Sequence, residues 1–104
     1  MAQMIAIYKT PNDMTAFDKH YFEVHVPLAK KLPGLIKYEV GRQPITSTTG
    51  HSDVYCIGTL YFESMDSIRK AFASPEGQAC AADRKILAPN NDDVQIYLFD
   101  SVEV

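Results

Sequence analysis

The strand-forming segments of this sequence are apolar on both faces, and no other feature constrains the fold more tightly. Residues 53–62 divide into two alternating sets, Val54, Cys56, Leu60 and Phe62 against Tyr55, Ile57 and Tyr61. Residues 94–102 divide in the same way, with Val94, Ile96 and Leu98 against Tyr97 and Phe99. Because successive side chains of a strand point to opposite faces of its sheet, both faces of this sheet need a cover.

The order of periodic segments predicts the topology. Residues 4–8, 35–40, 53–62 and 94–102 have the composition of strands, and 45–52 form a polar loop. A helix begins after the turn at 10–13, with Asn12 or Asp13 as its cap. Its apolar face holds Met14, Phe17, Tyr21, Val24 and Leu28.

We expect Pro27 to end or kink this first helix and Pro33-Gly34 to stop the chain's helical path. Ser64 caps a second helix, and Ser74-Pro75-Glu76 starts a further one that runs to about Arg84. The resulting order is βαββαβ, an α+β class. The predicted fold is ferredoxin-like, with one four-stranded antiparallel sheet and helices on one face.

The chain has 104 residues, which predicts a single domain over residues 1–104. Its two helical regions cover only one face of the sheet, so the other needs a second cover. A second copy of the chain, packed sheet against sheet, is the simplest one. We therefore predict a homodimer.

Charge and composition exclude several partners. The formal net charge is −3, which gives no basic surface for nucleic acid. No apolar stretch is long enough for a membrane helix, and the start of the chain does not resemble a signal peptide, so we expect a cytoplasmic protein. Cys56 and Cys80 form either one disulfide or, in a reducing compartment, two buried thiols.

His25 is the candidate catalytic residue. It lies at the edge of the apolar helix face, two residues before Pro27, where a broken turn opens space beside the sheet. A histidine there could serve as acid or base, or it could merely donate to a backbone carbonyl. We expect His20 and His51 to be solvated, and Asp83 to pair with Arg84, Lys85 or a backbone N–H. No cysteine, histidine and carboxylate spacing indicates a metal site.

Tyrosines are the second class of candidates. Most of those on strands are expected in the core or an interface, but a phenol beside a pocket can orient a ligand's oxygen. The candidate substrate-binding residues are Tyr8, Tyr21, Tyr38 and Tyr61. The sequence has no glycine-rich nucleotide-binding motif and no serine-hydrolase motif, and we predict no cofactor.

Two stretches of the sequence resemble the EthD family, named for ethyl tert-butyl ether degradation. The first runs from Pro11 through His20, the His25-Val26-Pro27 element and Leu32-Pro33-Gly34 to Tyr38. The second runs from Phe72 through Ser74-Pro75-Glu76-Gly77 to Asp83. The resemblance implies a dimeric α+β barrel, formed when two ferredoxin-like sheets pack face to face.

The resemblance also implies a small apolar, oxygenated ligand between the first helix and the sheet. A cofactor-free oxidoreductase, or an accessory to a catabolic oxidation such as ether degradation, is the first function it indicates. An isomerase or cyclase that uses His25 as acid and base is a second, and a non-catalytic carrier or stabilising dimer is a third. Whether the protein is an enzyme stays open at this point.

Overall fold

Four antiparallel strands form one sheet in the order β2-β3-β1-β4. The computed structural model describes all 104 residues. The strands are β1 (Ala2–Tyr8), β2 (Lys37–Val40), β3 (Cys56–Phe62) and β4 (Val94–Asp100). The two central strands are paired from Ala2↔Phe62 to Tyr8↔Cys56. This is the predicted α+β, ferredoxin-like arrangement.

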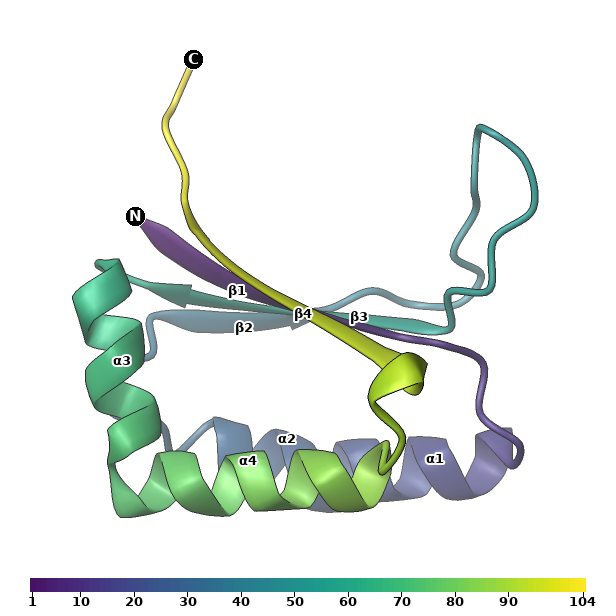
Figure 1. Cartoon of the computed structure of the whole chain (residues 1–104), viewed down its shortest axis with the longest axis horizontal. Helices are drawn as coiled ribbons and strands as arrows, with labels where there is room; N and C mark the ends of the chain where they lie inside the picture. Colours follow the sequence, from purple (N-terminus) through teal and green to yellow (C-terminus); the bar gives the residue numbers. More distant parts are fainter.

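The helices lie on one face of the sheet (Figure 1). They are α1 (Met14–His20), the π-helical turn η1 (Tyr21–His25), α2 (Val26–Ala29), α3 (Met65–Ala73) and α4 (Pro75–Leu87). A short 3-10 turn, η2 (Asn91–Asp93), precedes β4. Asp13, Ser64 and Ser74 cap the starts of α1, α3 and α4 through their side chains, because each accepts a hydrogen bond from an otherwise unpaired N–H.

Pro27 does not end the first helix, which rules out one of the two predicted outcomes, an end or a kink. α1, η1 and α2 follow one another without a break from Met14 to Ala29. In the π turn the Val26 N–H donates to the Tyr21 carbonyl, five residues back. Pro27 consequently falls in the first turn of α2, where a missing N–H costs little.

The predicted boundaries of all four strands differ from the observed ones, and β4 ends at Asp100 instead of at residue 102. β2 begins later than the sequence indicates, at Lys37, because its ladder with β3 starts at Lys37↔Tyr61. β3 also begins later, at Cys56, because its ladder with β1 ends at Tyr8↔Cys56. β1 begins earlier, at Ala2, because β3 and β4 pair with it on both sides. Helix α4 extends past Arg84 to Leu87.

The two faces of the sheet differ in burial. Burial alternates strictly along β3, with the even-numbered residues buried and the odd-numbered ones half-buried. The even-numbered residues of β1 and β3, with Tyr38 and Val40 of β2 and Val94 of β4, form the core with the helices; the most enclosed are Ala2, Tyr8 and Phe62. The segment between β2 and β3 and the C-terminal tail both rise on the opposite, open side (Figure 1).

Two further findings bear on the predictions. Cys56 and Cys80 are both buried and both free thiols. None of the helices has the length and apolar character needed to cross a membrane.

Candidate functional site

A cavity of about 120 Å³ lies between the helices and the covered face of the sheet. The sheet supplies mostly apolar side chains and the backbone of Gly58, and the helices supply His25, Cys80 and Arg84. An apolar cavity of about 150 Å³ is large enough for benzene, so this space suits roughly one six-membered ring. The few polar groups in its wall determine what chemistry it supports.

His25 presents one ring nitrogen to a buried carboxylate. It lies on η1, is 6% exposed, and its Nδ1 lies 2.9 Å from Oδ2 of Asp83 on α4. Because a carboxylate only accepts hydrogen bonds, Nδ1 carries the hydrogen and donates it. The other nitrogen, Nε2, has no hydrogen-bond partner in the protein. In this tautomer Nε2 holds a free lone pair on a residue that lines the cavity.

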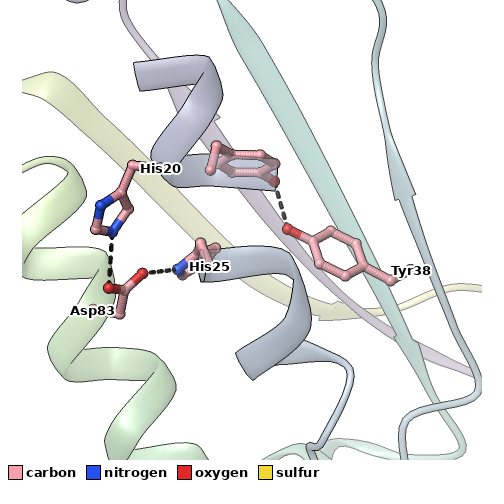
Figure 2. A network of polar contacts seen from close by, with 5 residues as sticks. His20, His25, Tyr38 and Asp83 are labelled. Carbon is pink, nitrogen blue, oxygen red and sulfur yellow. Dashed lines mark hydrogen bonds and ion pairs between the residues drawn. The ribbon is translucent and has the colours of Figure 1, made fainter. Parts of the chain in front are cut away.

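A second histidine contacts the same carboxylate. His20 Nε2 lies 2.8 Å from Oδ1 of Asp83, and the His20 side chain is 30% exposed (Figure 2). The predictions of a solvated His20 and of an Asp83 paired with Arg84, Lys85 or a backbone N–H were therefore wrong. The alternative role of His25 as a donor to a backbone carbonyl was wrong too. His51 is exposed, as predicted.

The π turn explains why both histidines reach one carboxylate. Residues five apart on a regular α-helix point about 140° away from each other. The wider turn at Tyr21–His25 adds a residue to the helical repeat and brings His20 and His25 to the same side, toward α4. The two histidines bond to different oxygens of Asp83, and no cluster of three His, Cys, Asp or Glu side chains could hold a metal ion.

Burial lowers the pKa of His25, and this is the largest influence on it. The hydrogen bond and the negative charge of Asp83 oppose that change, while His20 and Arg84 add to it. The imidazole is therefore neutral near pH 7 and available as a base. Once it accepts a proton, the adjacent carboxylate stabilises the cation.

Two tyrosine hydroxyls form a second polar group in the cavity wall. Tyr21 Oη on η1 and Tyr38 Oη on β2 lie 2.5 Å apart (Figure 2). Burial raises the pKa of both phenols well above the ordinary value, so both stay protonated. Tyr8 also lines the cavity, and burial raises its pKa as well.

Gly58 of β3 makes this hydroxyl pair possible. A Cβ at this position would lie 2.7 Å from Tyr21 Oη and 3.4 Å from a ring carbon of Tyr38. No side chain larger than hydrogen fits beneath the two phenols in their present positions. Sequence reasoning missed this glycine, although an isolated glycine in a strand often marks a close approach by another group.

The structure separates Tyr61 from the other candidate tyrosines. Tyr8, Tyr21 and Tyr38 all line the cavity. Tyr61 lies on the open face, where its hydroxyl donates to Glu39 over 2.8 Å and Lys37 lies 4.5 Å from its ring centre. The register pairs Tyr38 with Leu60, and the neighbouring residue Tyr61 therefore points the other way.

Fold and site together define a ferredoxin-like α+β protein in which a histidine–aspartate pair borders an apolar cavity. The EthD domain matches residues 9–88, and the chain belongs to this family. A protein of Rhodococcus erythropolis, described as an uncharacterized 11.0 kDa protein in the thcB-thcC intergenic region, is 40% identical over 84 residues. That alignment covers 80% of each chain.

Solved structures share the fold. A crystal structure of an ethyl tert-butyl ether degradation (EthD) family protein from Bacillus halodurans superposes with a TM-score of 0.88 at 32% identity, covering 98% of this chain and 99% of that one. SnoaB from Streptomyces nogalater, a cofactor-independent oxygenase, has a TM-score of 0.67 at 14% identity over 99% and 94%. A dimeric protein with a ferredoxin-like fold from Bacteroides fragilis has a TM-score of 0.65 at 19% identity over 96% and 95%. At these low identities the last two show the fold alone.

Proposed function

We propose that this protein binds a small, apolar, oxygen-bearing molecule in the cavity and that His25 transfers a proton to or from it. One observation carries the proposal. His25 Nδ1 is fixed by a buried carboxylate, while Nε2 has no protein partner on a residue that lines an apolar cavity. A buried base held in one tautomer beside a ligand-sized space is the arrangement that general acid–base catalysis requires.

The chemistry follows from the state of the histidine. Neutral His25 accepts a proton from a phenol, an enol or a carbon next to a carbonyl group. The imidazolium that forms keeps its hydrogen bond to Asp83, whose charge stabilises it in a poorly solvated place. The electron-rich anion left in the cavity is the species that reacts further.

A cofactor-free oxidation is our first proposal for that further reaction. A deprotonated phenol or enol is far more easily oxidised than its neutral form, so the base prepares the substrate for dioxygen as the oxidant. SnoaB, a cofactor-independent oxygenase, has a similar fold, which supports this choice. A role as an accessory in ether degradation would use the same binding site.

Isomerase or cyclase activity is the alternative, favoured by the histidine–aspartate pair itself. Returning the proton to a different atom of the anion completes an isomerisation without consuming oxygen. A ligand carrier would use the cavity but not the base. These functions make different demands on His25, which allows an experiment to distinguish them.

We also propose that the protein works as a homodimer, joined through the open face of the sheet. That face carries half-buried or exposed apolar side chains in three strands, among them Ile7, Ile57 and Phe99. The Bacteroides fragilis protein with this fold is dimeric, which supports the proposal. A dimer of this kind leaves both cavities on the outer, helix-covered faces.

The first test looks for a bound ligand and then measures turnover of two model substrates. Native mass spectrometry of the purified protein shows the assembly and any bound passenger. Turnover is then measured with hydroquinone, an oxidisable phenol, and with α-angelica lactone, whose isomerisation is a proton shift. We expect His25→Gln to lower the rate about 10²- to 10⁴-fold. His51→Gln, in an exposed loop, is the matched control and should keep the full rate.

The outcomes separate the functions. Oxygen uptake with hydroquinone indicates the oxidase, and lactone isomerisation without oxygen uptake indicates the isomerase. Binding of both compounds without any turnover, unchanged in His25→Gln, indicates a carrier and contradicts the catalytic role of His25.

A further inference from the structure

The Tyr21–Tyr38 hydroxyl pair has one hydrogen more than it uses internally. Each phenol has a single hydrogen, and only one hydrogen lies between the two oxygens at 2.5 Å. The Cys56 thiol lies near the Tyr21 oxygen, but sulfur is only a weak hydrogen-bond acceptor, and no other side-chain hydrogen bond reaches either hydroxyl. One O–H of the pair is therefore free to donate to something else.

The surroundings decide which O–H is free. Tyr21 is 1% exposed, its ring packs against Tyr8 and Phe17, and its oxygen lies directly above Gly58. Of the two acceptors near the Tyr21 hydrogen, Tyr38 Oη is much stronger than the Cys56 sulfur, and a buried hydrogen left unpaired is costly. Tyr21 therefore donates to Tyr38. Burial raises the pKa of Tyr38, and a hydrogen bond donated by Tyr21 opposes that increase.

We propose that the Tyr38 hydroxyl is the hydrogen-bond donor that recognises the ligand's oxygen, with Tyr21 as its positioning residue. The ligand class is a compound of about one ring that carries a phenol, enol or carbonyl oxygen. This inference rests on the proposed function and assigns the place of that oxygen. A chain of two hydroxyls donates more strongly than a single one, since each hydrogen bond polarises the next.

The position of the pair relative to His25 gives the ligand an orientation. Tyr21 and His25 lie on the same π turn, with ring centres 5.4 Å apart. One small ligand can then place its oxygen at Tyr38 and, at the same time, the atom that gains or loses a proton at His25. When His25 removes a proton, negative charge develops on the oxygen that Tyr38 holds, and the hydrogen bond strengthens as the reaction proceeds.

Arg84 is the alternative binding group. Arg84 also lines the cavity, and one nitrogen of its guanidinium donates to the Ala88 carbonyl over 3.0 Å. If Arg84 dominated recognition, the ligand would carry a carboxylate instead of a neutral oxygen. Benzoate tests this alternative directly.

Phenol and toluene are the probes that isolate the hydroxyl pair. They have the same shape, and toluene has a methyl group in place of the hydroxyl. A purely apolar cavity prefers toluene, because phenol must give up its hydrogen bonds to water on entry. We expect the wild-type protein to bind phenol at least as tightly as toluene by isothermal titration calorimetry at pH 7.

The variants assign the effect to named residues. Tyr38→Phe should weaken phenol binding about tenfold, the size of one hydrogen bond, and change toluene binding less than threefold. Tyr21→Phe should weaken phenol binding by a smaller factor, about threefold, because Tyr38 keeps its own hydrogen. Tyr61→Phe on the open face is the control and should alter neither affinity. Circular dichroism checks that each variant is folded.

Three results overturn the inference in distinguishable ways. Clear preference of the wild-type protein for toluene over phenol removes the role of Tyr38 but leaves the cavity as a binding site. Benzoate binding more tightly than phenol moves recognition to Arg84. Binding of none of the three compounds overturns the proposed function together with this inference.

Discussion

The two faces of the sheet carry similar side chains but differ in what lies over them. Tyr38 and Tyr61 show the contrast. Tyr38 on the covered face meets a second hydroxyl from the helix layer at 2.5 Å and borders the cavity. Tyr61 on the open face bonds to Glu39 of the adjacent strand, and no helix covers it.

The polar groups of the candidate site therefore come chiefly from the helices. His25 and Tyr21 belong to η1 and Asp83 belongs to α4, whereas the strands contribute Tyr8 and Tyr38 to an otherwise apolar wall. A site of this kind requires a helix layer over the sheet. No helix covers the open face, and its apolar side chains suit it for packing against another sheet.

We expect the largest effect from a charged substitution on the open face, which would disrupt the proposed dimer interface. Ile57→Lys places a charge on a central strand of that face, opposite Ile7, and burying it unpaired against a second sheet is strongly unfavourable. We expect the dimer dissociation constant to rise at least about 100-fold, by about 3 kcal/mol, in sedimentation equilibrium. Ile86 of α4 is 69% exposed, and Ile86→Lys is the matched control, which should leave the dimer intact. Dissociation in the Ile86 variant alone would move the interface to the helices.

Two adjacent residues sharpen the comparison through stability. Phe62 on the covered face is 0% exposed, and Phe62→Ala should lower the free energy of unfolding by about 3–5 kcal/mol at every protein concentration. Tyr61→Ala should cost less than half of this amount, and its cost should depend on concentration, because the proposed partner subunit would cover it. Urea denaturation at two protein concentrations measures both effects. Equal, concentration-independent losses would mean that Tyr61 is covered within its own chain.

Much of the fold was predictable because it depends on local patterns. The alternation in residues 53–62 and the caps at Asp13, Ser64 and Ser74 act over a few residues; the structure confirms the three caps, and it confirms the alternation from Cys56 to Phe62. The first helix was the exception. Pro27 is an accurate signal for a disturbed helix, but the disturbance is a π turn ahead of it and not an end.

The candidate site was only partly predictable because its contacts are long-range. The buried position of His25 beside a cavity followed from the helix pattern and Pro27. Asp83 lies 58 positions from His25 and 63 positions from His20 in the sequence. Its contacts with both histidines depend on how α4 packs against η1. A regular helix would place His20 and His25 on different sides, so the π turn had to be known first. Tyr38 and Tyr61 lie on opposite faces of the sheet, and the alternation alone does not show which of the two faces the helices cover.

The smallest expected effect is a pH dependence confined to the covered face, which holds the buried histidine. Because burial lowers the pKa of His25, the folded protein binds fewer protons than the unfolded chain in the range between the two pKa values. The contribution to stability is complete above about pH 6.5, the ordinary value for histidine, and is lost as the pH falls from there toward the lower folded value. Unfolding free energies between pH 5 and 7.5 should therefore show a slope that His25→Gln reduces and His51→Gln keeps. An unchanged slope in His25→Gln would mean that other groups cause the pH dependence. His25 would then be protonated as readily in the cavity as in water, and it would be too solvated for the base that we propose.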